Sequence, residues 1–344
     1  MPEDSLPMRL FGLADLVTPM ALRVAATLRL ADHIAGGAST IPSLAERISC
    51  DPDALGRLVR HLVAADVFTD SGDGTCGLGP LGRLLLSDDP ARGRDWLDIG
   101  GAVGRADLAL FRLLDTVTTG RAAYPLVYGQ GFWADLAADE ALSASFDALM
   151  GAHVHTGIAE LAGACDWGSA AHVVDVGGGN GTLLSAILAG QPDLRGTLVD
   201  LPGPAMAARA SLAEHGLADR CDVVAGSFFD PLPAGGDVYV LCGVLHDWND
   251  DDAVTILRGC ATAAGRDGRV VVIEGFLDEG SAPPRTGMDI RMLAYMSGRE
   301  RTLREFEALA ATAGLSVAAS RPVSFRTVLE LKPGPVTPDV RGAW

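Results

Sequence analysis

The pattern of apolar and polar residues divides the chain into a helical first half and a second half in which short apolar runs alternate with amphipathic segments. The apolar runs after residue 170 predict strands at about 172–176, 196–200, 222–226, 237–242 and 269–275, followed by a hairpin near 315–331. A helical segment separates each of the first five strands from the next. Strands that alternate with helices predict an α/β fold with an open, doubly wound sheet.

The first ninety residues predict a separate, mainly helical domain. The spacing of apolar residues predicts helices over 19–30 and 39–48, a helix that begins at Pro52, and a hairpin over 67–78 that turns around Gly72 and Gly74. Three helices followed by a hairpin form a winged helix-turn-helix. DNA binding needs a basic stripe, but the candidate recognition helix offers few bases among several acids. The apolar face of residues 19–30 therefore favours a winged helix used for dimerisation.

Between these parts lies a second helical stretch, over about 100–165, that is rich in large side chains. Its aromatic residues and methionine are Phe111, Tyr124, Tyr128, Phe132, Trp133, Phe146 and Met150. At helical spacing such residues form either a plain core or the wall of a ligand pocket. We expect the winged-helix dimerisation domain over residues 1–98, this connector over 99–168, the α/β domain over 169–334 and a tail over 335–344.

Composition narrows the classes of protein. A length of 344 residues favours two domains, and a formal charge of −17 argues against a nucleic-acid or anionic-membrane partner. Apolar runs such as 238–245 are shorter than the ~20 residues that span a bilayer. The acidic N-terminus does not resemble a secretory signal, and the six cysteines form no C-x-x-C pair. We therefore expect a cytoplasmic protein with no membrane partner.

The most informative motif joins the first strand of the α/β domain to its helix. It reads Asp175-x-Gly177-x-Gly179-x-Gly181, and the acidic Asp200 ends the next apolar run. Closely spaced glycines allow positive φ and let a ligand approach the backbone at the start of a helix. The spacing does not fit the dinucleotide fingerprint, because Thr182 stands where its third glycine would be. The motif predicts a cofactor site and resembles the glycine turn of S-adenosylmethionine (SAM) methyltransferases.

Ligands of doubly wound sheets bind beyond the carboxyl ends of the strands, at the switch point, which here lies between the first and fourth strands. The residues after the fourth strand, 242–248, should therefore face the reacting end of the cofactor. The acids at 250–252 could be interpreted as a metal site. Acids at the start of a helix are already explained by capping and by the helix dipole, so we expect no metal.

Five motifs in this order resemble the SAM-dependent O-methyltransferase family, which includes plant caffeic-acid O-methyltransferases and bacterial aromatic-polyketide and mitomycin-type tailoring enzymes. They are the glycine turn, 226–233 (GSFFDPLP), 245–248 (LHDW), 268–274 (GRVVVIE) and the segment from Asp289 to Thr302. The resemblance implies a winged-helix dimerisation domain and a Rossmann-like class I methyltransferase domain. It also implies a homodimer, SAM as cofactor and a small aromatic acceptor.

The resemblance also assigns residues to the site. It places His246, Glu274 and Glu300 in catalysis, His246 as general base with the two acids beside it. At the cofactor it places Asp175, Gly177, Gly179, Asp200, Leu201, Ser227, Phe228 and Cys242. Asp200 would bind the ribose and Ser227 the adenine, where the family more often has Asp. At the acceptor it places Phe146, Met150, Asp247, Trp248, Met292 and Met296.

The chemistry supports a histidine in this role. Methyl transfer from a sulfonium to oxygen needs a deprotonated, aligned nucleophile and no metal, and an imidazole can take the proton of a phenol as attack proceeds. Two rival functions stay open. One is a SAM-binding relative that carries out another tailoring reaction, hydroxylation or decarboxylation, because fold and cofactor do not determine chemistry. The other is a ligand-sensing DNA-binding regulator, which the acidic charge argues against.

Overall fold

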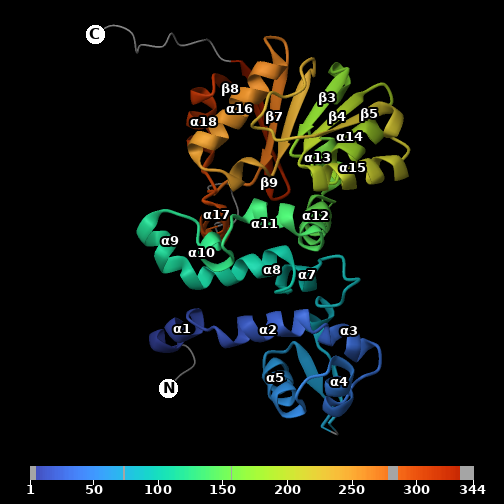
Figure 1. The fold of residues 1–344 in the computed structure, drawn as a ribbon, viewed down its shortest axis with the longest axis vertical. Helices are drawn as coiled ribbons and strands as arrows, with labels where there is room; N and C mark the ends of the chain where they lie inside the picture. The colour runs from blue at the N-terminus through green and yellow to red at the C-terminus, as the bar shows by residue number, and fades with distance from the viewer. Residues whose placement is uncertain (1–4, 73, 156, 278–285, 334–344) are drawn as a thin grey trace. The chain divides into compact units, whose positions relative to one another are not determined.

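The computed structural model describes residues 5–72, 74–155, 157–277 and 286–333. The chain divides into two compact units, Met1–Leu108 and Ala109–Trp344, which are described one at a time (Figure 1). The predicted tail, 335–344, lies outside the described residues.

The first unit is mainly helical and contains the predicted winged helix. Its elements are α1 (Leu6–Leu13), α2 (Val17–Thr27), α3 (Leu30–Ala35), α4 (Ile41–Ile48), α5 (Pro52–Ala64), the antiparallel strands β1 (Phe68–Asp70) and β2 (Cys76–Leu78), α6 (Pro80–Arg83), α7 (Gly93–Leu97) and α8 (Ala102–Asp107). Gly72 and Gly74 have φ of +81° and +82°, as a tight turn between short strands requires. Thr40 caps α4 with a capping box, and Asp51 caps α5.

The helix predicted over 19–30 is instead two helices. Helix α2 ends at Thr27, and Arg29 has a left-handed φ of 53° before α3 begins at Leu30. Leu30 and Ile34 then join the buried core of this unit. An apolar periodicity that runs through both helices hides such a break, because each piece has its own buried face.

Helix α1 has no buried residue. Large apolar side chains are exposed along it and at the start of α2, namely Leu6, Met8, Leu10, Phe11, Leu13, Leu16 and Val17. Within the described part of the chain, Leu6–Thr27 is the one stretch long and apolar enough to cross a membrane by length and composition. The expectation that no run reaches this length was therefore wrong, although the stretch is interrupted between Leu13 and Val17.

The second unit begins with the helical connector. Its elements are η1 (Leu108–Arg112), α9 (Leu113–Thr119), α10 (Tyr124–Tyr128), α11 (Phe132–Ala138), α12 (Glu140–His155), α13 (Ile158–Ala162) and η2 (Trp167–Ser169). Ring contacts join α10, α11 and α12 into one aromatic cluster that also includes Tyr295 of a later helix. The large side chains of the connector therefore pack on one another.

A seven-stranded sheet forms the rest of the second unit. The strands are β3 (His172–Val176), β4 (Arg195–Asp200), β5 (Cys221–Ala225), β6 (Val238–Cys242), β7 (Arg269–Glu274), β8 (Leu315–Val323) and β9 (Arg326–Pro333), in the order β5-β4-β3-β6-β7-β9-β8. The first five strands pair in parallel, and the hairpin of β8 and β9 adds to β7 in antiparallel fashion. The predicted doubly wound sheet is confirmed, with β3 beside β6 at the switch point.

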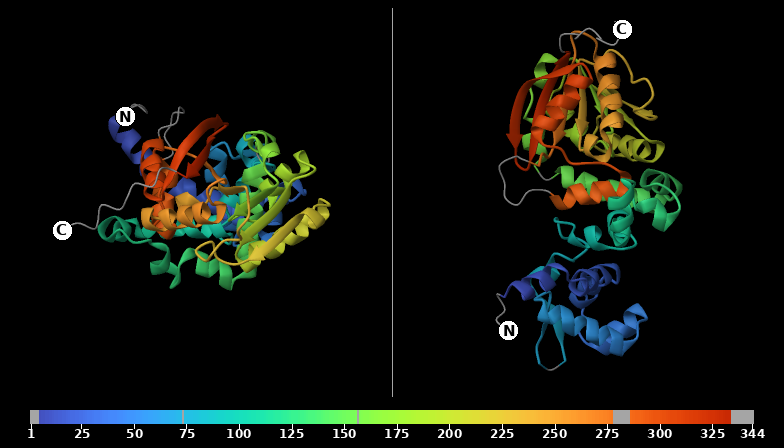
Figure 2. Two further views of the ribbon diagram at one scale, coloured as in Figure 1. Left: turned by 90° about the horizontal axis from the view of Figure 1, so that it is seen from above. Right: turned by 90° about the vertical axis from the view of Figure 1, so that its left-hand side faces the viewer.

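Helices cover both faces of this sheet (Figures 1 and 2). The covering helices include α14 (Thr182–Gly190), α15 (Pro202–Glu214), α16 (Asp250–Ala264) and α18 (Leu303–Thr312), with the short turn η3 (Ala218–Arg220) before β5. The turn η4 (Leu245–Asp247) follows β6, and α17 (Thr286–Met296) contacts α9, α10 and η4. Side chains of α16 and α18 fill one core cluster, and those of α13, α14 and α15 fill the other. Alternate residues of β3 enter opposite clusters, which explains its uninterrupted apolar run.

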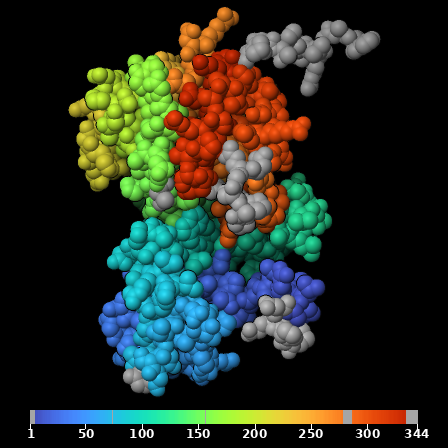
Figure 3. Space-filling model, turned by 180° about the vertical axis from the view of Figure 1, so that it is seen from behind, coloured from blue at the N-terminus to red at the C-terminus, as the bar shows by residue number. Residues whose placement is uncertain are grey.

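Strand β8 forms the far edge of the sheet and is largely exposed, as the red surface in Figure 3 shows. Arg321 and Pro322 lie in this strand. A charge and a proline on an edge strand discourage pairing with a further strand. The edge is therefore protected, and the ligand site lies elsewhere, at the carboxyl ends of the central strands.

Candidate active site

The switch point brings two loops to the same edge of the sheet. The glycine turn follows β3, residues 243–248 follow β6, and β3 and β6 are parallel neighbours. A Cβ added to Gly177 would lie 2.9 Å from Cγ2 of Val244, so the first loop packs directly against the second. The two motifs that the sequence separates by about seventy residues therefore form one site.

The glycines of the turn are needed for both conformation and space. Gly177, Gly179 and Gly181 have φ of +74°, +57° and +79°. A Cβ on Gly178 would lie 2.6 Å from Oδ2 of Asp175, which places that carboxylate directly beneath the turn. Any side chain here would distort the turn or displace Asp175.

Asp200 lies at the end of β4 and is tied to the glycine turn. Its Oδ2 accepts a hydrogen bond from the amide of Gly179 at 2.7 Å, and its Oδ1 accepts one from the amide of Leu201 at 2.7 Å. A carboxylate offers about four acceptor positions, so it can also accept from ribose hydroxyls. Burial raises the pKa of Asp200, and these two amide hydrogen bonds oppose the rise.

Two more carboxyl groups are electrostatically coupled to Asp200. Asp175 is 2% exposed, and neither of its oxygens has a hydrogen-bond partner among the described residues. Burial and Asp200 raise the pKa of Asp175 to about 7. Burial and Asp200 also raise the pKa of Asp147, on α12, to about 6. Desolvated acids with unused oxygens fit a cationic ligand, so the site suits the sulfonium and ammonium groups of SAM.

Asp147 was not predicted from the sequence. Its neighbours Phe146 and Met150 were assigned to the acceptor, and the acid between them was given no role. The fold shows the missing relation, because a Cβ on Gly151, one turn further along α12, would collide with Nδ2 of the Asn180 side chain in the glycine turn. Helix α12 therefore lies across that turn.

The residues expected at the adenine lie in a small aromatic group. Phe228 and Phe229 contact Trp248 edge-on, with ring centroids 5.8 Å and 4.8 Å away. The hydroxyl of Ser227 accepts a hydrogen bond from the amide of Phe229 at 3.2 Å. Trp248, which the sequence assigned to the acceptor, thus lies beside the residues assigned to the adenine. Cys242 ends β6, and burial raises the pKa of its thiol to about 12, so the thiol stays protonated.

His246 lies in the short 3-10 turn η4 with an acid at each ring nitrogen. Its Nδ1 is 2.8 Å from Oε1 of Glu300, and its Nε2 is 3.5 Å from Oδ1 of Asp247. The imidazole keeps 26% of its side-chain surface exposed, whereas Glu300 keeps 1%. A hydrogen bond from Nδ1–H to Glu300 would fix the tautomer that leaves Nε2 able to accept a proton.

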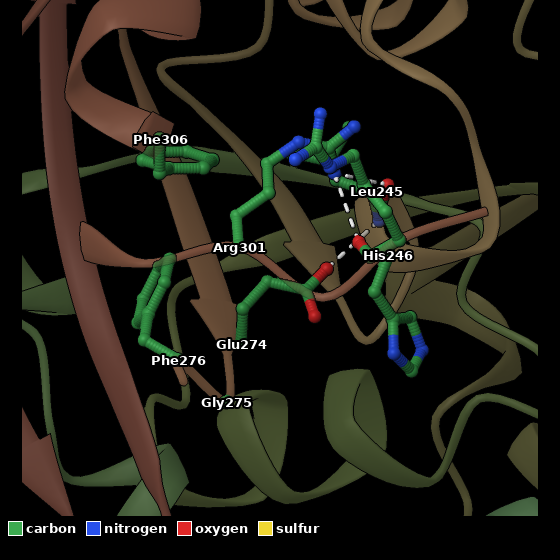
Figure 4. Close-up of a pocket in the computed structure, with 8 residues that line it drawn as sticks. Leu245, His246, Glu274, Gly275, Phe276, Arg301 and Phe306 are labelled. Atoms are coloured by element: carbon green, nitrogen blue, oxygen red, sulfur yellow. Dashed lines mark hydrogen bonds between the residues drawn. The ribbon is translucent and has the colours of Figure 1, made fainter. Parts of the chain in front are cut away.

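Glu274 has a different place from the one predicted. The sequence placed it beside the imidazole, but its Oε1 accepts hydrogen bonds from the backbone amides of Val244 and Leu245 at 3.0 and 2.8 Å (Figure 4). A carboxylate at the end of β7 reaches the loop after β6 because the two strands are neighbours. Glu274 therefore holds the loop backbone and acts on His246 only through its charge.

Burial alone would lower the pKa of His246. Three carboxylates, those of Asp247, Glu274 and Glu300, outweigh burial and raise the pKa of His246 to about 10. Burial raises the pKa of Asp247 to about 7, against the opposing effect of His246. The imidazole therefore carries a proton at neutral pH, and only its neutral form, which becomes more populated as the pH rises, can accept another.

The expected acceptor residues lie on α12, within the aromatic cluster of the connector, and on α17, which contacts this turn. Phe146 contacts Phe132 and Trp133 with ring centroids 5.6 and 5.5 Å away, and Met150 follows one turn later on α12. Helix α17 carries Met292 and Met296 and contacts η4. Large apolar side chains form a surface suited to a flat aromatic molecule.

The first acids of α16 belong to a helix start, as predicted. Asn249 caps the helix, and Asp250, Asp251 and Asp252 form its first turn. Asp250 also forms ion pairs with Arg299 and Arg301. The described residues contain no group of three or more His, Cys, Asp or Glu side chains that could hold a metal ion.

The doubly wound sheet, the glycine turn and the acid at the end of β4 define a class I, SAM-dependent methyltransferase. Residues 111–316 match the O-methyltransferase domain, and residues 11–88 match the O-methyltransferase dimerisation domain. The chain therefore belongs to the O-methyltransferase family with an N-terminal dimerisation domain and is a SAM-dependent O-methyltransferase.

Its relatives include enzymes of antibiotic biosynthesis. The chain is 52% identical to a 2,7-dihydroxy-5-methyl-1-naphthoate 7-O-methyltransferase of Streptomyces carzinostaticus, over 93% of this chain and 96% of the relative. It is 50% identical to the aclacinomycin 10-hydroxylase of Streptomyces purpurascens, over 93% and 87%. A crystal structure of an O-methyltransferase from neocarzinostatin biosynthesis, in complex with SAM and 2-hydroxy-5-methyl naphthoic acid, matches with a TM-score of 0.90 at 52% identity, over 94% of this chain and 98% of the other.

Proposed function

We propose that this enzyme methylates a phenolic or quinone-derived hydroxyl of an aromatic secondary metabolite of the hydroxynaphthoate type, with His246 as general base. The observation that carries the proposal is the placement of His246 between Glu300 and Asp247 beside the glycine turn. Similarity to the naphthoate 7-O-methyltransferase and to the structure that holds a naphthoic acid supports the acceptor class.

The residues divide the work in the following way. When bound, SAM supplies a methyl group on a sulfonium, which the acceptor oxygen displaces to give S-adenosylhomocysteine (SAH). Asp200 and the glycine turn hold the cofactor, and the aromatic side chains around Phe146 orient a flat acceptor. His246 takes the hydroxyl proton on Nε2 while Glu300 stabilises the resulting imidazolium through Nδ1.

Asp247 has two possible effects in this scheme. Its carboxylate lies 3.5 Å from Nε2 and therefore near the path of the acceptor proton. It stabilises the charged imidazole and can also accept from an acceptor hydroxyl. We propose that Asp247 contacts the acceptor, as the resemblance implies. This contact is made next to His246.

A second candidate function is hydroxylation. It is favoured by one observation, the 50% identity to the aclacinomycin 10-hydroxylase over nearly the whole chain. Incubation with SAM and a panel of naphthoates, anthracyclines and simple phenols separates the two candidates by product mass. Methylation adds a CH2 unit and releases one SAH for each product. Hydroxylation inserts one atom of O2 while two electrons from an added thiol reductant convert the other atom to water, and it releases no SAH, so the incubation is done in air with a thiol present.

We also propose that the enzyme is a homodimer and works in the cytoplasm. The matched dimerisation domain and the exposed apolar residues of α1 support the dimer. Similarity to the naphthoate 7-O-methyltransferase supports the location, and the acidic charge argues against nucleic acid as a partner.

A further inference from the structure

The buried guanidinium of Arg301 has no role in the function proposed above. Its side chain is 4% exposed. It donates to the carbonyl oxygen of Leu245 at 2.9 Å and to that of Trp248 at 2.9 Å, and it pairs with Asp250 at 2.8 Å. The two carbonyls lie on either side of His246 in the chain. Figure 4 shows the guanidinium directed at this loop, with the imidazole pointing away from it.

Glu274 binds the same loop at its other polar groups. Its carboxylate accepts hydrogen bonds from the amides of Val244 and Leu245, whereas the guanidinium of Arg301 donates to the carbonyl oxygen of Leu245 (Figure 4). Both side chains are buried, so water does not compete for these hydrogen bonds, and hydrogen bonds to charged groups are the stronger kind. The backbone around His246 is therefore held between one buried negative and one buried positive group.

The segment that carries Arg301 also touches His246 directly. The amide of Arg299 donates to the carbonyl oxygen of His246 at 2.9 Å. A Cβ on Gly298 would lie 2.4 Å from that same oxygen, so the two chains are in close contact. Glu300, between these residues, binds Nδ1. A change in the position of this segment would therefore alter both the backbone of His246 and its partner.

We propose that Arg301 is a positioning residue that, with Glu274, clamps the loop of residues 244–248 and holds the His246 imidazole against Glu300. This inference rests on the proposed role of His246 as base. Proton transfer needs the acceptor nitrogen within hydrogen-bond reach, and a shift of ~1 Å can cost on the order of 100-fold in rate.

A purely structural role for Arg301 would be to neutralise Asp250. Asp250 is 54% exposed and already pairs with Arg299 at 3.1 Å. An exposed acid with another partner has little need of a buried one. Its bonds to two carbonyl oxygens of the turn around His246 are not explained by neutralisation of Asp250.

The test compares Arg301→Met and Arg301→Lys with the matched control Arg299→Met. Arg299 is a neighbouring arginine that also pairs with Asp250 but is 47% exposed. For each variant we would measure thermal stability, SAM affinity by calorimetry, kcat and KM, and the pKa of His246 by NMR of histidine-labelled enzyme with SAH bound. His246→Ala identifies the His246 signal.

For Arg301→Met we expect kcat to fall about 10-fold to 100-fold with SAM affinity unchanged. The pKa of His246 should move toward its ordinary value, because Glu300 no longer meets Nδ1. Lysine keeps the charge but lacks the planar fork, so Arg301→Lys should recover part of the rate. Arg299→Met should match the wild type in every measurement.

An unchanged kcat and an unchanged His246 signal in Arg301→Met would overturn the clamp, even with lowered thermal stability. If Arg301→Met does not fold, Arg301→Lys decides: wild-type rate and wild-type His246 signal would then overturn it. Failure of the proposed function is recognised separately, by full turnover in His246→Ala.

Discussion

Oε1 of Glu300 lies 2.8 Å from Nδ1 of His246, and the carboxylate is almost fully buried while the imidazole is partly exposed. This arrangement orients the ring through Nδ1, while Nε2 lies 3.5 Å from Oδ1 of Asp247. Glu300 is itself held, because its amide donates to Asp289 of α17 at 2.9 Å. The base, its acid partner and the helix expected at the acceptor are thus linked by two hydrogen bonds.

The first prediction tests His246 as the general base. His246→Ala should lower kcat by about 10²-fold to 10⁴-fold at neutral pH and leave SAM affinity unchanged, because the imidazole binds neither ribose nor adenine. Raising the pH should restore part of the rate, since more of the acceptor then ionises unaided. His153→Ala, a change in another histidine of the same unit, provides a comparison. Near-normal turnover of His246→Ala from pH 6 to 9 would instead mean that positioning alone drives the reaction.

The second prediction separates Glu300 from Glu274. The carboxylate of Glu300 raises the pKa of His246 through a direct hydrogen bond, so Glu300→Gln should lower that pKa. A base must be neutral to accept a proton, so with His246 as base kcat/KM should rise with pH, and this rise should move to lower pH in Glu300→Gln. The measurement is the pH profile of kcat/KM.

Glu274→Gln should behave differently, because its amide oxygen can still accept from the two loop amides. We expect a smaller shift of the profile, due to the lost charge alone. Equal shifts in the two variants would mean that distance and hydrogen bonding to the imidazole do not matter, and would contradict the assignment of distinct roles.

The positions of the strands along the chain could be predicted because apolar runs and glycine turns are local features of the sequence. The run that ends at Asp175 gives β3 with the bounds expected for it. The break at Arg29 could not be predicted, because the apolar periodicity of α2 and α3 is continuous across it. A left-handed residue other than glycine leaves little trace in the sequence.

The candidate site, like the fold, was predicted only in part. His246 and Glu300 were found through motifs, and the structure brings them within hydrogen-bond distance. The partners of Glu274 could not be predicted. A family motif indicates that an acid lies near His246, but it does not say whether the acid binds the imidazole or the backbone of the same loop. Arg301 and Asp147 were missed because their partners are carbonyl oxygens and distant acids, which no residue type reveals.

The third prediction concerns stability and pH. His246 has a folded-state pKa raised from 6.5 to about 10. A group whose pKa is raised on folding contributes stability below its unfolded pKa and loses it as pH rises through the folded value. The melting temperature of the ligand-free enzyme should therefore fall between pH 6.5 and 10.

Scanning calorimetry in this range measures the effect, and His246→Ala supplies the control. That variant should show a shallower fall, because the proton taken up on folding is lost with the imidazole. A wild-type melting temperature that stays constant or rises from pH 6.5 to 9 would contradict the raised pKa.

The fourth prediction is that the chain is a dimer that depends on α1. Leu10 and Leu13 are 64% and 86% exposed in the single chain, which is unusual for leucine unless another surface covers it. Leu10→Glu combined with Leu13→Glu should give a monomer in light scattering at micromolar concentration. Replacing the exposed Leu114 by Glu tests whether any surface leucine has this effect, and a dimer in both cases would remove α1 from the interface.

The fifth prediction concerns the three coupled acids at the cofactor. Asp147 and Asp175 have pKa values raised to about 6 and about 7, mainly by burial and then by Asp200. Raised values mean that these groups are protonated at pH 5 and ionised at pH 8. SAM carries one more positive charge than SAH, on the sulfonium, and the two share every other ionisable group. Ionised carboxylates favour the extra cation, so SAM affinity should increase from pH 5.5 to 8 more steeply than SAH affinity.

Calorimetry of SAM and SAH at several pH values measures this difference directly. Asp147→Asn should flatten the SAM curve and weaken SAM at pH 8 by about tenfold, the scale of ~1.4 kcal/mol for one charged contact, with a smaller effect on SAH. Glu140→Gln changes an exposed acid at the start of the same helix and should leave both curves as in the wild type. Parallel pH curves for SAM and SAH in the wild type would mean that the acids do not sense the sulfonium, and Asp147 would then be only a polar residue of α12.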